Sequence, residues 1–164
     1  MRIRVDSLSF TYSSGVKALD DVSLEIESGE VIAIVGENGA GKTSLVKHFN
    51  GFLHPGQGEV WVGDWDCSQH STAQLASRVG YLFQNPDEQL FERSVYKEVA
   101  FGPRNLGFTE AEVAERVASA LERVGLMDEA ESHPYDLQYI ERKLLSLAAA
   151  LAMDTPILIL DEPT

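Results

Sequence analysis

The sequence predicts an α/β fold organised around a phosphate-binding loop, with an antiparallel β layer at the N-terminus and a helical insertion in the second half. Three observations support this fold class. An apolar run over 31–35 leads into a glycine-rich turn over 36–43 and then into a helical pattern. A second aliphatic run, over 157–160, leads directly into two carboxylates. Between these runs, alternating strand patterns give way to helical periodicity from residue 94 onward.

The first apolar run, 31–35, predicts a buried strand, and the residues after Gly36-Glu37-Asn38-Gly39-Ala40-Gly41-Lys42-Thr43 predict a helix. Strand, glycine turn and helix are the context that a phosphate-binding loop requires. Glycines let the backbone curl around an anion, and the N–H groups at a helix start point toward it. Lys42 adds a positive charge, and the Thr43 hydroxyl is a candidate Mg²⁺ ligand. The alternative, an incidental glycine turn, leaves this full pattern unexplained. We therefore expect a P-loop NTPase core.

Four other strands are expected, two of them from alternation of apolar and polar residues. This alternation predicts strands over 2–10 and 19–26, with further strands over 59–62 and 78–83. The helix that starts at Lys42 should end near Asn50-Gly51, because glycine favours the left-handed conformation of a helix C-terminus.

The second half is predominantly helical. Thr109-Glu110-Ala111-Glu112 is a capping box, and the helix that it opens should end at Gly125. A second helix is expected over 137–153, before a buried parallel strand over 157–160. We expect one partial domain over 1–164, made of an antiparallel layer and phosphate-loop core (1–85), a helical subdomain (86–146) and a return to the core (147–164).

Composition excludes several classes of function. The formal net charge of −13 argues against a broad nucleic-acid footprint and against a basic face held to anionic lipid. The single cysteine, Cys67, excludes an internal disulfide framework. The chain shows no secretory leader and no apolar run near the roughly 20 residues of a membrane span. We expect a cytoplasmic protein with no nucleic-acid partner and no membrane insertion of its own.

Asp161 and Glu162 follow the aliphatic run over 157–160. A carboxylate at the C-terminal end of a buried strand can hold Mg²⁺ opposite a phosphate loop, and a neighbouring carboxylate can orient or deprotonate water. The alternative is a polar cap where the strand leaves the core. The presence of the phosphate loop favours the catalytic interpretation.

These motifs resemble those of the ATP-binding cassette (ABC) ATPases over the whole chain. Residues 36–43 resemble the Walker A motif, and 157–164 resemble Walker B with Glu162 at the catalytic-base position. Tyr12 matches the aromatic residue that stacks on adenine, and Gln84 matches the Q-loop glutamine. The resemblance implies the cofactors ATP and Mg²⁺. It assigns ATP binding to Tyr12, Gly36, Asn38, Gly39, Ala40, Gly41, Lys42, Thr43 and Ser44. It assigns the metal to Thr43, Gln84 and Asp161. It assigns catalysis to Glu162, Lys42 and Gln84.

A narrower resemblance lies in 84–91 and 99–107, which look like the ATPase subunits of energy-coupling-factor importers for vitamins or cobalt and nickel ions. The resemblance implies an ATPase that powers a membrane importer, held on the cytoplasmic side of the membrane through a transmembrane coupling subunit. Leu90 and Phe91 would suit a groove that receives a helix of that subunit. The alternative for these two residues is ordinary packing of the helical insertion.

The family's signature motif, Leu-Ser-Gly-Gly-Gln, is replaced here by Leu137-Gln138-Tyr139-Ile140-Glu141. The family uses this motif to cover ATP held by a partner domain, and its glycines let backbone N–H groups approach the γ-phosphate. Side chains at 139 and 140 and the charge of Glu141 should make a poor lid. We therefore expect an asymmetric pair in which a second, homologous ABC domain supplies an intact signature. The alternative is drift without functional consequence.

The chain also stops at Thr164, before the family's dimer-contacting loop and switch histidine. We therefore expect a C-terminally truncated ABC domain that alone hydrolyses ATP weakly or not at all. Two alternatives remain open: a non-catalytic or regulatory nucleotide-binding domain, and a soluble ABC protein that acts on nucleic acid or ribosomes.

Overall fold

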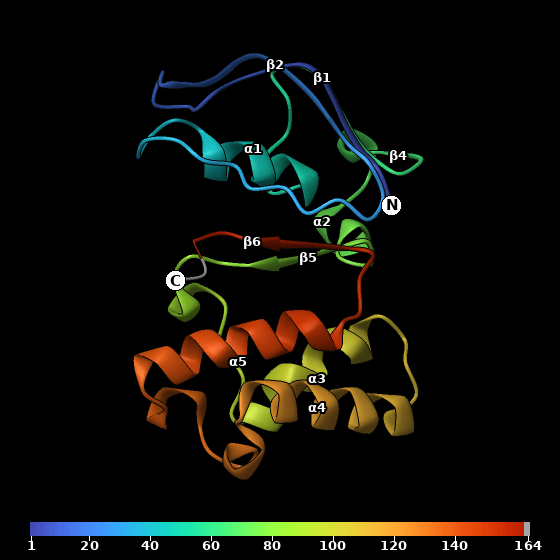
Figure 1. Cartoon of the computed structure of the whole chain (residues 1–164), viewed down its shortest axis with the longest axis vertical. Helices are drawn as coiled ribbons and strands as arrows, with labels where there is room; N and C mark the ends of the chain where they lie inside the picture. The colour runs from blue at the N-terminus through green and yellow to red at the C-terminus, as the bar shows by residue number, and fades with distance from the viewer. Residues whose placement is uncertain (163–164) are drawn as a thin grey trace. The chain divides into compact units, whose positions relative to one another are not determined.

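The computed structural model describes residues 1–162 and divides the chain into two compact units, Met1–Val79 and Gly80–Thr164 (Figure 1). The predicted division at 85 and 146 remains a prediction.

The first unit contains a four-stranded antiparallel sheet of order β2-β1-β3-β4. Its strands are β1 (Ile3–Thr11), β2 (Lys17–Ile26), β3 (Gln57–Val62) and the short β4 (Trp65–Asp66). Val5 of β1 lies opposite Leu24 of β2 and Val60 of β3, so the alternating apolar residues share one face. Buried members of that face include Ile3, Val5, Leu8, Val60 and Val62. The strands predicted over 2–10, 19–26 and 59–62 are thereby confirmed.

Helix α1 (Lys42–Phe49) and the short α2 (Thr72–Leu75) complete the first unit. Leu45 and Phe49 of α1 are buried. Gly51, directly after the C-cap, has a φ of +74°, which agrees with the expected end of this helix.

The predicted buried strand over 31–35 is wrong for the described chain. These residues form no strand, and the side chains of Val31 and Val35 are 98% and 86% exposed. A strand is stabilised by the hydrogen-bond ladder of a neighbour, and no strand within residues 1–162 pairs with this segment. Apolarity alone therefore did not decide its structure.

The second unit contains β5 (Val79–Leu82) and β6 (Ile157–Leu160), which pair with each other and run in the same direction (Figure 1). Both strands were predicted. Leu158 and Leu160 are exposed, however, so β6 is buried on one face and not on both.

Three helices make up most of the second unit: α3 (Val95–Asn105), α4 (Glu110–Val124) and α5 (Tyr139–Ala152). The capping box at Thr109 and the left-handed C-cap at Gly125 are both present, as predicted. Helix α5 starts two residues later than expected, with Gln138 as its N-cap. Short 3₁₀ turns lie at Pro86–Glu88, Met127–Glu129 and Pro134–Asp136.

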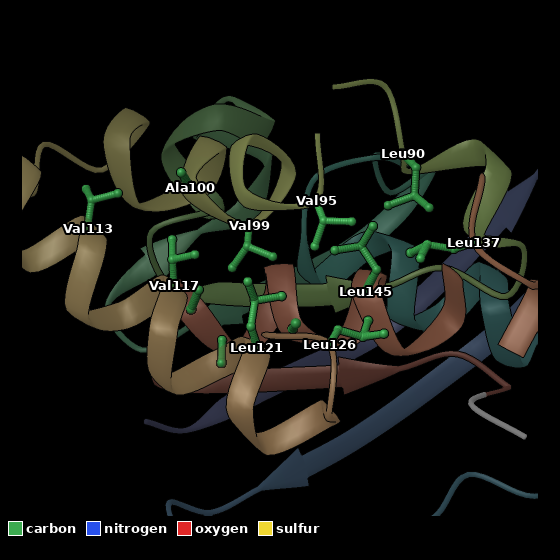
Figure 2. Packing of buried hydrophobic residues seen from close by; sticks show 13 residues of the cluster. Leu90, Val95, Val99, Ala100, Val113, Val117, Leu121, Leu126, Leu137 and Leu145 are labelled. Atoms are coloured by element: carbon green, nitrogen blue, oxygen red, sulfur yellow. The ribbon is translucent and has the colours of Figure 1, made fainter. Parts of the chain in front are cut away.

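One hydrophobic cluster joins these three helices (Figure 2). Val113, Val117 and Leu121 recur at helical spacing on α4 and point toward side chains of α3 and α5. Leu145 of α5 and Leu90, from the segment before α3, are also buried in it. This packing fixes the start of α5 and the segment around residue 90, two regions with predicted functions.

Candidate functional site

The side chain of Lys42 bonds back to the backbone of the phosphate loop over 36–41. The Lys42 Nζ donates hydrogen bonds to the carbonyl oxygens of Gly36 (3.0 Å) and Glu37 (2.9 Å). The ammonium group therefore lies over the loop, where an anion held by the loop would meet a positive charge.

Two glycines give the loop its shape. Gly39 and Gly41 have φ values of +83° and +90°, in the left-handed region that favours glycine. At Gly41 a Cβ atom would also lie only 2.4 Å from the carbonyl oxygen of Ala18. Helix α1 begins directly after Gly41, and no side chain within residues 1–162 caps its N-terminus. The first N–H groups of α1 therefore remain suited to an anion.

Tyr12 is connected to the same helix. Its hydroxyl group shares a hydrogen bond of 2.8 Å with Ser44 Oγ, and its ring meets the ring of Phe10 edge-on at 4.9 Å. The Tyr12 side chain is 37% exposed, whereas Ser44 is buried. An aromatic face thus remains accessible near the phosphate loop, as a stacked base would require. Of the other predicted ATP residues, Gly36, Asn38, Gly39 and Ala40 are exposed, and Gly41, Lys42 and Thr43 are half-buried.

In the second unit, Asp161 is fixed by β5 through two contacts. Its N–H donates to the carbonyl oxygen of Leu82 (3.1 Å), and its Oδ2 accepts a hydrogen bond from the Tyr81 hydroxyl (2.8 Å). Tyr81 and Asp161 are each only 9% exposed. Burial, followed by the hydrogen bond and the charge of Asp161, raises the pKa of the Tyr81 phenol, so this group stays a protonated donor.

Glu162 is held by Gln84. The Gln84 Nε2 donates to Glu162 Oε2 over 2.5 Å, and the Lys143 Nζ lies 3.5 Å from the Glu162 carbonyl oxygen. Glu162 has a φ of +48°, which is uncommon for a residue with a side chain. Such strain often accompanies functional sites, because the surrounding contacts must stabilise it.

The predicted site residues thus fall into two groups. Tyr12 and residues 36–44 belong to the first unit, and Gln84, Asp161 and Glu162 belong to the second. No cluster of three or more His, Cys, Asp or Glu side chains suited to a metal occurs in residues 1–162. Thr43, Gln84 and Asp161 each carry a side-chain oxygen, which is the donor type that Mg²⁺ prefers, so their assignment to the metal remains a prediction.

Sequence reasoning missed Tyr81 and Lys143 as neighbours of the predicted carboxylates. Tyr81 is separated from Asp161 by 80 positions. The available signal was the strand predicted over 78–83, because successive side chains of a strand point to opposite faces and Tyr81 must therefore lie on one of them. Only the pairing of β5 with β6 identifies Asp161 as the residue that this face meets.

The replaced signature segment forms the start of α5. Glu141 Oε2 accepts a hydrogen bond from the N–H of Gln138 (2.7 Å). Ile140 is 71% exposed and Tyr139 is also exposed, with the Lys143 ammonium 5.7 Å from the Tyr139 ring. The Glu141 carboxylate therefore accepts a backbone hydrogen bond at this helix N-terminus, and the two bulky residues just before it in the sequence are exposed.

The expected partner groove around 90–91 is wrong for Leu90 and remains a prediction for Phe91. Leu90 is 3% exposed and belongs to the helical cluster, so it is not available to a partner. Phe91 is 60% exposed, and its ring meets the exposed ring of Phe101 edge-on at 4.7 Å. Glu98, buried, accepts hydrogen bonds at Oε2 from the N–H groups of Phe91 (2.9 Å) and Glu92 (2.7 Å). This carboxylate fixes the turn that displays Phe91.

Across the part of the chain that the structure describes, no helix is both long and apolar enough to cross a membrane. Pro163 and Thr164, the end of the predicted Walker B motif, lie outside the described residues.

Comparison with known proteins identifies the family. A protein of Pyrococcus furiosus named as an ABC transporter ATP-binding protein is 49% identical over 162 residues, which are 99% of this chain and 62% of the relative. The energy-coupling factor transporter ATP-binding protein EcfA of Methanothermobacter thermautotrophicus is 44% identical over 99% of this chain and 53% of its own length. The chain thus spans roughly half to two thirds of these relatives.

Solved structures agree with this fold. CbiO1 from Clostridium perfringens, described as part of the ABC transporter complex cbiONQ, superposes with a TM-score of 0.81 at 37% identity. The match covers 97% of this chain and 64% of that one. The expected P-loop NTPase fold is confirmed. The family model for ABC transporters matches residues 19–164, and the chain therefore belongs to the ABC transporter family.

Proposed function

We propose that this chain is the ATP-binding and ATP-hydrolysing part of a membrane importer of the energy-coupling-factor type, which takes up vitamins or transition-metal ions. The observation that carries the proposal is the pair of pre-formed groups: a phosphate loop closed by Lys42, and a Glu162 carboxylate held by Gln84. The EcfA and CbiO1 relatives support the importer type.

The predicted site residues have the following roles in this proposal, with Gln84 serving in two of them. The loop N–H groups and Lys42 would bind the phosphates, Tyr12 would stack on the adenine, and Thr43, Gln84 and Asp161 would supply oxygens to Mg²⁺. Mg²⁺, when bound, neutralises charge that develops on the phosphates. Glu162 accepts a proton from the attacking water, and Gln84 keeps the carboxylate oriented.

The test is phosphate release by the assembled transporter with Lys42→Ala and Glu162→Gln variants. Loss of the general base should lower turnover by about 10²–10⁴-fold while ATP binding persists. Lys42→Ala should weaken ATP binding itself. If Glu162→Gln turned over ATP like the wild type, the role of Glu162 as the base would be wrong. If the assembled wild-type complex released no phosphate, the non-catalytic nucleotide-binding function would replace the proposal.

We also propose that this chain works in an asymmetric pair with a second ABC domain that carries an intact signature. Support comes from the start of α5, where Glu141 takes the Gln138 N–H and Tyr139 and Ile140 are exposed. A phosphate at this surface would meet a carboxylate and two side chains instead of free N–H groups. Restoring Ser-Gly-Gly-Gln at 138–141 should raise the total ATPase activity of the pair, and unchanged turnover would contradict the asymmetry.

The Phe91–Phe101 pair is our candidate contact for the transmembrane coupling subunit, which would hold the chain at the cytoplasmic face of the membrane. Exposed aromatic residues held in fixed positions are typical anchors of protein interfaces. Phe91→Ala should reduce co-purification with the membrane subunit. Val16→Ala, which changes an exposed residue of the first unit, is the control.

A further inference from the structure

Tyr81 places a buried phenol against the carboxylate of Asp161. Its hydroxyl donates to Asp161 Oδ2 over 2.8 Å, and the next residue of β5, Leu82, accepts the Asp161 N–H over 3.1 Å. Successive residues of one strand therefore fix both the backbone and the side chain of Asp161. The strands β5 and β6 run side by side in the same direction (Figure 1), and Asp161 directly follows the end of β6.

The Tyr81 ring is itself held in place. This ring and the Phe83 ring meet edge-on, with centroids 4.9 Å apart and an interplanar angle of 67°, and the residue is 9% exposed. A packed aromatic ring has few rotamers, so its hydroxyl cannot easily follow a carboxylate that rotates. The hydrogen bond from a phenol to a carboxylate is charge-assisted and stronger than a neutral one.

A carboxylate held through one oxygen binds a metal differently from a mobile one. Mg²⁺ requires nearly octahedral geometry with single-oxygen contacts, whereas Ca²⁺ accepts longer bonds, more ligands and carboxylates that bind through both oxygens. A donor fixed at Oδ2 opposes the rotation that two-oxygen binding needs. The geometry of Tyr81 thus favours the smaller ion.

We propose that Tyr81 is a positioning residue that keeps Asp161 as a one-oxygen ligand and thereby favours Mg²⁺ over Ca²⁺. The proposal rests on the proposed function, in which Asp161 holds the metal of the bound nucleotide. It adds a determinant of metal preference to that function.

The test compares ATP affinity in Mg²⁺ and in Ca²⁺ by calorimetry, for the full-length wild-type protein and Tyr81→Phe. Outer contacts of metal ligands typically contribute about 10–100-fold to metal affinity, so Tyr81→Phe should weaken Mg²⁺-dependent ATP binding by about tenfold. Ca²⁺-dependent binding should fall by clearly less, so the preference for Mg²⁺ decreases. Tyr135→Phe is the matched control, because it removes a phenol whose bond goes to the Leu90 carbonyl oxygen (3.2 Å) in the same unit.

The outcomes distinguish a failure of the proposed role of Tyr81 from a failure of the proposed metal-binding role of Asp161. Equal losses in both metals, or an unchanged ratio, would overturn the role of Tyr81. Asp161→Asn tests the proposed function: if it leaves metal-dependent binding unchanged, Asp161 does not hold the metal. If Tyr81→Phe does not fold, ¹⁹F NMR of wild-type protein with fluorotyrosine at position 81 replaces it. The Tyr81 resonance should then move differently with MgATP and CaATP, and identical shifts would overturn the inference.

Discussion

The side-chain amide of Gln84 donates to the carboxylate of Glu162 over 2.5 Å, although 78 positions separate them. This bond restrains the proposed base at a residue whose φ is +48°. Such a restraint keeps the carboxylate in one orientation before substrate arrives. Gln84 would then influence turnover through Glu162.

Replacing Gln84 with Ala should therefore lower turnover of the assembled transporter by less than Glu162→Gln does, because the base is still present but less well oriented. The loss from Glu162→Gln is expected to be about 10²–10⁴-fold. Steady-state phosphate release measures both variants, and Gln69→Ala, which changes an exposed glutamine, is the control. A Gln84→Ala enzyme as fast as the wild type would show that the bond has no catalytic role.

The glycines of the phosphate loop should differ in their sensitivity to alanine. Gly41→Ala combines a φ of +90° with a Cβ atom 2.4 Å from the Ala18 carbonyl oxygen, whereas Gly39→Ala meets only the unfavourable φ of +83°. The left-handed conformation alone costs about 1–2 kcal/mol. At Gly36 the added Cβ would make an ordinary 3.5 Å contact with Ala40.

Urea unfolding followed by tryptophan fluorescence measures this order. Both tryptophans, Trp61 and Trp65, lie in the first unit and therefore report on the unit that holds the loop. We expect Gly41→Ala to be the least stable variant and Gly36→Ala to resemble the wild type. Equal stability of the Gly41 and Gly39 variants would contradict the predicted clash.

Much of this fold follows from local sequence, and the exceptions have a common physical cause. Alternation predicted β1 and β2, and the capping box with Gly125 predicted both ends of α4, because these signals act within a few residues. The segment over 31–35 was apolar enough for a buried strand, yet pairing depends on a neighbour that local sequence does not reveal.

In the candidate site, too, local sequence predicts the contiguous motif but not the contacts between distant residues. The phosphate loop was recognisable because its glycines and lysine are contiguous. The bonds from Tyr81 to Asp161 and from Gln84 to Glu162 join residues about 80 positions apart, and only the pairing of β5 with β6 brings them together. Leu90 was expected at the surface, although it is buried. Two adjacent apolar residues, Leu90 and Phe91, are too short a pattern to show the helical or strand period that would distinguish a buried residue from an exposed one.

Glu98 should stabilise the turn before α3 through one oxygen. Its Oε2 accepts both the Phe91 and the Glu92 N–H groups, while burial raises the pKa of the carboxyl. Glu98→Gln keeps a carbonyl oxygen for both donors and removes the buried charge, so stability should be unchanged or higher. Glu98→Ala leaves two donors without their acceptor, at a cost of about 1–3 kcal/mol each.

Hydrogen exchange of the Phe91 and Glu92 amides distinguishes these variants. Exchange should accelerate in Glu98→Ala and stay slow in Glu98→Gln. Glu92→Gln, which changes a neighbouring acidic residue on the same turn, is the matched control. If both Glu98 variants exchanged at the same rate, the carboxyl oxygen would not be what holds the turn.

His48 should make the first unit sensitive to acid. The side chain is fully buried in α1, its Nδ1 lies 2.7 Å from the Ser44 carbonyl oxygen, and its Nε2 has no hydrogen-bond partner within residues 1–162. Desolvation is the main cause that lowers the pKa of this imidazole from its ordinary value of 6.5. The unfolded chain therefore binds a proton below pH 6.5 that the folded chain resists.

The contribution of His48 to stability is thus complete above pH 6.5 and falls as the pH drops toward the lower folded-state pKa, by at most about 1.4 kcal/mol per pH unit. Urea unfolding by tryptophan fluorescence between pH 7.5 and 5 should show this decrease. His48→Phe, which keeps a ring edge-on to Phe10, should remove that part of the slope, and His133→Asn, in the second unit, should retain it. An identical slope in His48→Phe and wild type would place the acid sensitivity on another group.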